Sequence, residues 1–279
     1  MKVLRKIYYK LSPKSRRTAR RLCYLPIDLY ETITNKRNGM IPPRGKIFIG
    51  RGDFVTQGEH IKALLTELAG LKPSHSILDI GCGIGRAAVA LTSYLDQSGR
   101  YEGFDIVKEG IDWCNKKINS RFPNFRFKHI DLRNDLYNLS TDVAAKDFKF
   151  PYGNGEFDCA VLTSVFTHMM PEDVDNYLGE IHRVLKTGGK CLATFFILTP
   201  GSKSAMKGKE FDFKYSFGDY SLIDKHVKEA NVAFEKKFLD KMFAKNDLTV
   251  EHTYYGYWSG RQAEGAKDFQ DVVILRKDD

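Results

Sequence analysis

The sequence contains no long apolar run. No stretch of its 279 residues approaches the roughly 18 consecutive apolar residues that a membrane-spanning helix requires. The first residues also lack the apolar core of a secretory signal. We therefore expect a globular, cytoplasmic protein, and the length and apolar content are sufficient for a sizeable buried core.

Paired cysteines are absent as well. The five cysteines are odd in number, scattered and never arranged as Cys-x-x-Cys: Cys23, Cys82, Cys114, Cys159 and Cys191. Such spacing fits neither a disulfide framework nor a zinc site. We expect these side chains to be reduced and mostly buried.

Acidic residues are missing from the first 27 positions. This segment holds nine of the 44 lysines and arginines and no Asp or Glu, so it carries the whole net charge of +9. Its apolar positions fall on one face of a helix: Val3, Leu4, Ile7, Tyr8 and Leu11. Ser12 and Pro13 then predict the start of a second, short helix. We define residues 1–45 as the basic amphipathic arm.

Several roles fit the basic amphipathic arm. It suits the surface of an anionic membrane, nucleic acid, or an organelle transit segment. A solvated arm, or one packed on its own domain, is equally compatible with the composition. The sequence leaves these alternatives open, and peripheral membrane association of a cytoplasmic protein is among them.

From residue 76 onward, short β-branched runs alternate with helical stretches. This alternation is typical of an α/β fold with a doubly wound parallel sheet and helices on both faces. Seven strands are predicted, at residues 76–82, 100–106, 125–131, 157–165, 189–198, 248–255 and 269–276. Helices are predicted at residues 60–71, 84–95, 108–119, 171–185 and 230–245.

The stretch SILDIGCGIGR joins the first of these strands to a glycine-rich loop. Its glycines are spaced Gly-x-Gly-x-Gly, and Arg86 stands where a dinucleotide fingerprint needs its third glycine. Asp79 lies two residues before the first glycine, where it would repel a pyrophosphate and attract a cation. The loop therefore favours S-adenosylmethionine (SAM), which has a cationic amino group, a sulfonium and no phosphate.

ILDIGCGIGR resembles the first motif of the class I SAM-dependent methyltransferases, and residues 50–276 follow the rest of that pattern. The resemblance implies a Rossmann-like sheet with strand order 3-2-1-4-5-7-6, mostly parallel with the last strand antiparallel. It also implies that Asp105 in YEGFDIV binds the ribose hydroxyls and that Asp131 in FKHIDLR binds the adenine amino group. The full expected SAM-binding set is Asp79, Gly81, Cys82, Gly83, Gly85, Arg86, Asp105, Ile106, Asp131, Leu132, Thr163 and Ser164.

Each of these side chains also has a plain structural interpretation. Asp105 is suited to cap the following helix, and Asp131 to sit in a turn. Arg86 either binds the cofactor carboxylate or faces solvent. Cys82 has no neighbour in the sequence that would activate its thiol, so it contributes only a small side chain to the loop.

The acceptor site is less specified. His168, just after the fourth strand, is the candidate general base, with packing beside the cofactor as its structural alternative. We place residues 46–279 in the methyltransferase domain, with residues 199–230 as an inserted substrate lid, because the family uses this position for lids. The expected acceptor-binding set is Phe166, His168, Tyr254, Tyr255, Tyr257 and Trp258, although aromatic clusters also form cores.

The absence of three family motifs excludes several classes of methyl acceptor. The position after the fourth strand lacks the Asn/Asp-Pro-Pro-aromatic turn of base-amine methyltransferases and the paired glutamates of arginine methyltransferases. Carboxylate ligands of the metal-dependent catechol enzymes do not stand out, so we expect no metal. The leading hypothesis is a SAM-dependent methyltransferase for a small-molecule acceptor, either a saccharide or a lipid-linked metabolite. The alternatives are an RNA methyltransferase that uses the basic arm and a SAM-binding regulator without catalysis; a dehydrogenase fits worst.

Overall fold

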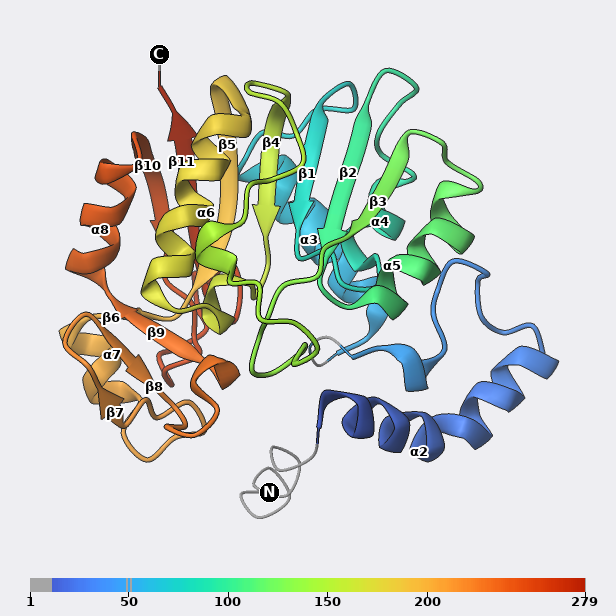
Figure 1. Cartoon of the computed structure of the whole chain (residues 1–279), viewed down its shortest axis with the longest axis horizontal. Helices are drawn as coiled ribbons and strands as arrows, with labels where there is room; N and C mark the ends of the chain where they lie inside the picture. Colours follow the sequence, from blue (N-terminus) through green and yellow to red (C-terminus); the bar gives the residue numbers. More distant parts are fainter. Residues whose placement is uncertain (1–11, 49, 51, 279) are drawn as a thin grey trace.

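The computed structural model describes residues 12–48, 50 and 52–278. The predicted seven-stranded sheet is confirmed, with the order β10-β11-β5-β4-β1-β2-β3 (Figure 1). Its strands are β1 (Ser76–Ile80), β2 (Arg100–Asp105), β3 (Phe125–His129), β4 (Phe157–Leu162), β5 (Leu185–Phe195), β10 (Leu248–Tyr254) and β11 (Asp271–Lys277). Only β11 runs antiparallel to its two neighbours, as expected for the last strand.

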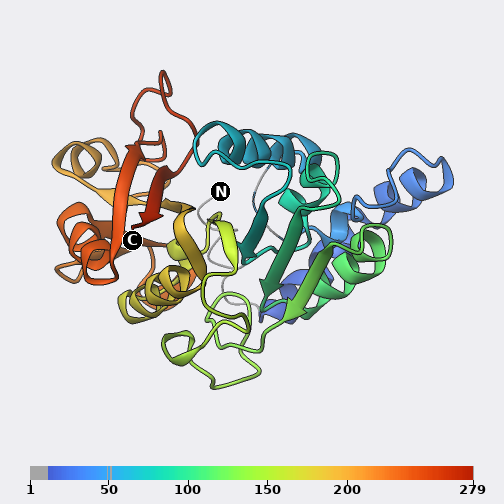
Figure 2. The ribbon, with the colours of Figure 1, turned by 90° about the horizontal axis from the view of Figure 1, so that it is seen from above.

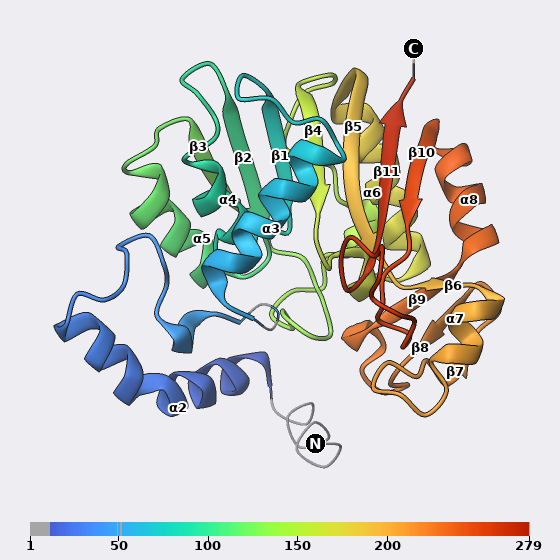
Figure 3. The same cartoon turned by 180° about the vertical axis from the view of Figure 1, so that it is seen from behind.

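Helices cover both faces of this sheet, as Figures 1 and 3 show from opposite sides and Figure 2 from above. One face carries α3 (Phe54–Glu67), α4 (Arg86–Leu91) and α5 (Lys108–Cys114), and the other carries α6 (Pro171–Val184) and α8 (Lys236–Lys245). Successive strand residues pack into the two different cores: Ile77 lies against α3 and α4, whereas Leu78 belongs to the core beneath α6 and α8. Burial on both faces explains why inner strands such as β4 and β11 read as nearly continuous apolar runs, whereas the edge strands β3 and β10 are partly exposed.

Two helices begin six residues away from the predicted start. α3 begins at Phe54, six residues early, because the Asp53 carboxylate accepts hydrogen bonds from the backbone N–H of Val55 (3.0 Å) and Thr56 (2.9 Å). The helix predicted from residue 230 is wrong at its start. Val232–Glu235 forms strand β9, and α8 begins only at Lys236.

β9 belongs to a small second sheet that the sequence analysis did not predict. The order is β6-β9-β8-β7, from β6 (Ile197–Leu198), β9 (Val232–Glu235), β8 (Tyr220–Leu222) and β7 (Tyr215–Ser216). Its connections include α7 (Pro200–Ala205) and the short helix η5 (Lys228–Ala230). The predicted insertion, 199–230, therefore supplies β7 and β8 and the connections between the strands of this sheet. It lies at the end of the large sheet where the parallel strands terminate (Figure 1).

The arm contains one long helix, α2 (Pro13–Ile33), instead of the short helix expected after Pro13. The Ser12 side chain caps it by accepting a hydrogen bond from the Ser15 N–H at 3.1 Å. α2 runs across the molecule below the carboxyl ends of the strands (Figure 1) and is joined to α3 through η1 (Arg44–Lys46). The amphipathic helix predicted within residues 1–11 lies outside the described residues. Among the helices that the structure describes, none has the length and apolar character to cross a bilayer.

Candidate active site

A cavity of about 1640 Å³ opens at the carboxyl ends of β1, β2 and β4. Ligands of open α/β sheets bind at this edge. The volume exceeds the roughly 300–1,000 Å³ of a pocket for one drug-sized molecule. Segments far apart in the chain complete the lining: 13–17 from α2, 208–211 from the insertion, 229–231 beside the small sheet, and 266–270 before β11.

The glycine loop brings bare backbone to this cavity. Gly81, Gly83 and Gly85 all have positive φ, at 77°, 60° and 83°. A Cβ on Gly81, which lines the cavity, would collide with Val165, and a Cβ on Gly85 would lie 2.7 Å from the Ile118 side chain. Gly83 and Gly85 do not line the cavity, so their role is to turn the chain into α4.

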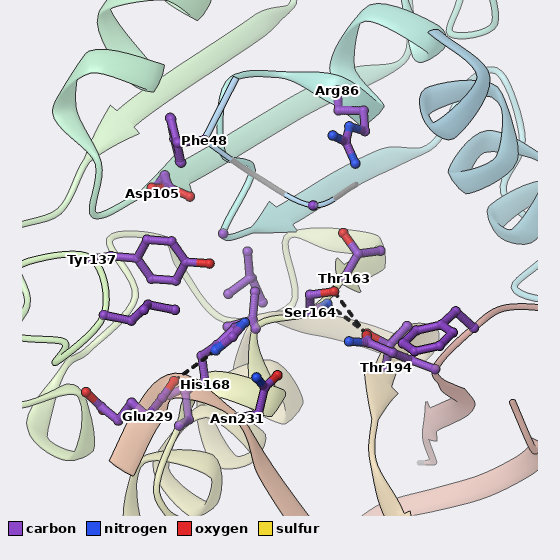
Figure 4. Close-up of a pocket in the computed structure, with 18 of the residues that line it drawn as sticks. Phe48, Arg86, Asp105, Tyr137, Thr163, Ser164, His168, Thr194, Glu229 and Asn231 are labelled. Atoms are coloured by element: carbon purple, nitrogen blue, oxygen red, sulfur yellow. Dashed lines mark hydrogen bonds between the residues drawn. The ribbon is translucent and has the colours of Figure 1, made fainter. Parts of the chain in front are cut away.

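Asp105 stands at the end of β2 and faces the cavity (Figure 4). Its Oδ2 accepts a hydrogen bond from Gly83 N–H (2.8 Å), and its Oδ1 accepts one from Val107 N–H (2.7 Å). Burial raises the pKa of this carboxyl to about 6, against the opposing effect of these bonds. Each oxygen keeps acceptor capacity, which is what a pair of ribose hydroxyls requires. Ile106, next in the chain, also lines the cavity.

A second buried carboxyl, Asp79 in β1, lines the same part of the cavity. The Tyr101 hydroxyl donates a hydrogen bond to it. Burial is the main cause that raises the pKa of Asp79 to about 7, and the charge of Asp105 adds to it. Arg86, at the start of α4, supplies a buried guanidinium that also faces the cavity. This pairing suits a ligand with both a cationic and a carboxylate group and disfavours a pyrophosphate.

Asp131 and Leu132, both predicted to bind SAM, follow β3 and lie in different surroundings. Leu132 is buried and lines the cavity, whereas Asp131 is exposed, lies outside the cavity and accepts a hydrogen bond from Asn138 Nδ2 (2.8 Å). Cys82 lines the cavity, and burial raises the pKa of its thiol, consistent with a passive side chain. Four of the five cysteines are buried, as expected; Cys23 is exposed.

Ser164, in the loop after β4, takes a left-handed backbone conformation with φ of 60°. Its N–H donates to Thr194 Oγ1 (2.7 Å), and both Ser164 Oγ and Thr194 Oγ1 donate to Gln270 Oε1 (3.0 and 2.7 Å). The Gln270 amide N–H groups are then left for other acceptors. All three residues line the cavity, as does Thr163. Thr194 and Gln270 were not predicted, because nothing in the sequence links strand five to the residue before β11.

His168 ends the short helix η4 (Phe166–His168) and points into the cavity opposite Asp105 and Arg86 (Figure 4). Its Nδ1 lies 2.9 Å from the carbonyl oxygen of Glu229. A carbonyl only accepts, so Nδ1 carries the proton and Nε2 of the neutral ring keeps its lone pair. Burial lowers the pKa of His168, which favours this neutral form. Glu229 also lines the cavity, and burial raises the pKa of its carboxyl to about 7.

Comparisons with known proteins agree with this geometry. A family described as "Methyltransferase domain" matches residues 78–193. An uncharacterized methyltransferase of Synechocystis is 32% identical over 47% of this chain and 51% of that protein. The crystal structure of the PH0226 protein of Pyrococcus horikoshii has a TM-score of 0.55 at 19% identity, covering 84% of this chain and 95% of the other. Residues 78–193 thus match a methyltransferase domain, and the fold is that of the class I SAM-dependent methyltransferases.

SAM is the cofactor of this family, and the residues of this methyltransferase fit it. Another solved structure, the 1,6-didemethyltoxoflavin-N1-methyltransferase of Burkholderia thailandensis, was crystallised with S-adenosylhomocysteine; it has a TM-score of 0.50 at 16% identity, covering 96% of this chain and 92% of that one. The fit rests on the cavity itself: a loop that has no room for a Cβ at Gly81, and two buried carboxyls beside one guanidinium. The alignments with four curated relatives, among them the Synechocystis protein, span 32% to 63% of those proteins' lengths.

Most of the aromatic residues predicted to bind the acceptor lie outside the cavity of this methyltransferase. Tyr257 lines it. Phe166 instead stacks on Phe195 in the core, with ring centroids 4.9 Å apart, and Trp258 is buried against Phe196. Tyr254 is partly buried against the α3 core, and Tyr255 lies exposed beneath the guanidinium of Arg261.

Trp258 shows why the aromatic pattern misled. Its indole N–H donates to Asp271 Oδ2 at 2.7 Å, and the same buried carboxylate accepts hydrogen bonds from Ile197 and Gly256 N–H. The ring therefore joins the small sheet to the large one. The cavity receives other rings in its place, from Tyr137 and Phe211.

Proposed function

We propose that this protein transfers a methyl group from SAM to a small-molecule acceptor, a saccharide or a lipid-linked metabolite, with His168 as the general base. The observation that carries the proposal is one continuous cavity with Asp105 and Arg86 on one side and His168 on the other (Figure 4). When bound, SAM supplies an electrophilic methyl group on a sulfonium. The volume leaves space for an acceptor beside the cofactor.

Three charged side chains bind different parts of the cofactor. Asp105 accepts hydrogen bonds from the ribose hydroxyls, since its backbone partners occupy only part of its acceptor capacity. Asp79 attracts the cationic amino group, and Arg86 binds the carboxylate of the methionine portion. Burial excludes water from these contacts and strengthens them.

The acceptor side favours a group that must lose a proton. Nε2 of neutral His168 takes the proton that a hydroxyl loses when it is methylated, while the Glu229 carbonyl holds Nδ1–H and fixes the ring. The Gln270 amide is placed to orient an oxygen of the acceptor. A small-molecule acceptor is also supported by a curated relative, the 2-phytyl-1,4-naphtoquinone methyltransferase of Nostoc punctiforme, 22% identical over 57% of this chain and 63% of that protein.

Calorimetric titration with SAM tests the cofactor half of the proposal. We expect micromolar binding by the wild type. Asp105→Asn should weaken it by about tenfold to a hundredfold, the scale of about 1.5–3 kcal/mol for hydrogen bonds to a charged group. Asp112→Asn is the matched control, because Asp112 is exposed on α5, outside the cavity lining, and pairs with Lys108. Absence of SAM binding, or equal effects of the two substitutions, would refute the assignment.

Methyl transfer from labelled SAM to a panel of quinols, sterols and glycosides tests the base. His168→Asn keeps a side-chain N–H for the Glu229 carbonyl but has no basic nitrogen. We expect kcat to fall by about 10²–10⁴ with an unchanged Kd for SAM, and His182→Asn, on α6 outside the cavity, to behave like wild type. A His168→Asn enzyme with wild-type kcat rules out the base. If the wild type binds SAM but methylates none of these acceptors, the non-catalytic alternative is favoured.

A further inference from the structure

α2 is an amphipathic helix whose apolar face is exposed to solvent. Surface helices normally bury their apolar stripe and expose their polar face. Here the apolar residues Leu22, Leu25, Leu29 and Ile33 recur at the spacing of one helix face, and their exposures are 66%, 49%, 53% and 80%. We call these four residues the apolar stripe. They form a continuous exposed patch of a kind that marks an interaction surface.

The opposite face of α2 makes polar contacts with the segment of the arm that follows it. Asp28 accepts hydrogen bonds from the N–H groups of Arg44 (2.7 Å) and Gly45 (2.9 Å), and Glu31 pairs with Arg37 (3.1 Å) and Arg44 (2.8 Å). The acidic side chains of α2 are therefore already neutralised on its inner side. The apolar stripe is left facing away from the protein.

The charges around the apolar stripe indicate what covers it. The first half of α2 carries Lys14, Arg16, Arg17, Arg20 and Arg21, and no acidic residue occurs before Asp28. Lys14 and Arg21 are exposed, and Arg21 also pairs with Glu109 of α5. An exposed apolar face continuous with a basic segment matches the surface of an anionic bilayer, where lysine and arginine meet head groups and leucine enters the acyl boundary. A second copy would bring two such basic segments together, which is unfavourable.

The first turn of α2 also connects this surface to the cavity. Pro13, Arg16 and Arg17 line the cavity, and Arg16 donates to the Leu136 carbonyl oxygen at 3.1 Å. Leu22 lies nine residues after Pro13, about 14 Å along the axis at 1.5 Å per residue. A membrane that covers the apolar stripe would thus lie close to the cavity opening.

We infer that the apolar stripe of α2 docks this protein on an anionic lipid bilayer and presents the cavity to the membrane surface. Resting on the proposed function, the acceptor is then an amphiphilic molecule held in that bilayer. The sequence assigned membrane contact to residues 1–27, and this part of the inference adds an apolar contact at residues 22–33, within the part of the arm that the structure describes.

Vesicle flotation of the full-length protein tests the inference. Wild type should bind mixed phosphatidylcholine–phosphatidylglycerol vesicles and bind pure phosphatidylcholine far less. Leu22→Ser/Leu25→Ser/Leu29→Ser should reduce the bound fraction on mixed vesicles by at least about fivefold, since the apolar contribution to interfacial binding is lost. Leu139→Ser/Val143→Ser is the matched control, because these residues are similarly exposed, at 51% and 53%, and lie outside the apolar stripe, in the loop whose Leu136 carbonyl oxygen accepts a hydrogen bond from Arg16 in the first turn of α2. The control should float like wild type.

SAM titration of all three proteins keeps this inference separate from the proposed function. Equal SAM affinity with lost flotation supports docking by the apolar stripe. Equal flotation of wild type and the triple variant, or flotation by neither, overturns it, whatever the SAM result. Two further outcomes also overturn it: a dimer in sedimentation velocity that the triple variant abolishes, and salt-sensitive RNA binding without vesicle binding.

Discussion

Asp79→Asn should stabilise the cofactor-free protein at alkaline pH and weaken its binding of SAM. The wild-type carboxyl is buried in β1, and its hydrogen bond from Tyr101 does not offset the desolvation of the charge. Asparagine is nearly isosteric, keeps an oxygen for the Tyr101 hydroxyl and never ionises. The substitution therefore removes a buried negative charge that destabilises the cofactor-free protein. It also removes the carboxylate that attracts the cationic amino group of SAM.

The magnitude follows from the shift in the pKa of Asp79, from 3.8 to about 7. At about 1.4 kcal/mol per pKa unit, ionisation destabilises the folded state by about 4 kcal/mol at pH 8 and about 2 kcal/mol at pH 5. Between pH 4 and pH 7 the folded state binds more protons than the unfolded state, so this residue makes stability fall as the pH rises through that window. Relative to wild type, Asp79→Asn should therefore gain about 2.6 kcal/mol between pH 5 and pH 8.

Urea unfolding of cofactor-free wild type, Asp79→Asn and Asp112→Asn at the two pH values measures this gain. Comparing each variant with wild type at both pH values cancels any packing effect that does not depend on pH. Asp112→Asn should show no such gain, because Asp112 is exposed. The reasoning about Asp79 is refuted if its variant differs from wild type by the same free energy at pH 5 and pH 8.

Three further substitutions test the pH dependence of SAM binding and the stability of the fold. Tyr101→Phe removes a hydrogen bond that lowers the pKa of Asp79, so the pH above which SAM affinity reaches its plateau should move upward in calorimetric titrations; an unmoved profile contradicts this. Gly85→Ala should lower the free energy of unfolding by about 1–3 kcal/mol more than Gly188→Ala, because both positions have positive φ but only the first lacks space for a methyl group. Equal losses in urea unfolding would show that backbone strain alone matters. Asp271→Ala should cost about 3 kcal/mol or more in the same assay, because it leaves buried N–H donors without an acceptor; a loss below about 1 kcal/mol would contradict that role.

The large sheet could be predicted because its strands are buried on both faces and produce apolar runs that no loop would tolerate. The cofactor side of the cavity followed for the same reason, since Asp79 and Asp105 lie at or near the ends of neighbouring parallel strands and must share an edge. The small sheet could not be predicted. Its strands are two to four residues long, too short for a periodic pattern, and Val232–Glu235 merged with the helix that follows it.

The acceptor side could be predicted only in part. His168 follows a strand of the large sheet, so its position was readable, but its partner Glu229 lies 61 residues away and reaches it only through tertiary packing. Gln270 is likewise brought to Ser164 across 106 residues. The aromatic cluster near Trp258 gave the wrong expectation because the sequence does not show that Asp271 accepts its indole N–H.

Two structurally different parts of the molecule line the cavity: strands of the large sheet on one side and connecting segments on the other. The half proposed to hold the cofactor is built on strands whose side chains pack into both cores. The other half is lined by segments 13–17, 208–211, 229–231 and 266–270, which lie at the periphery of the large sheet. Segments 13–17 and 208–211 contain no strand of the large sheet, so substitutions there leave its strands unchanged. Descendants of such a protein can therefore acquire new acceptors while they inherit the cofactor unchanged.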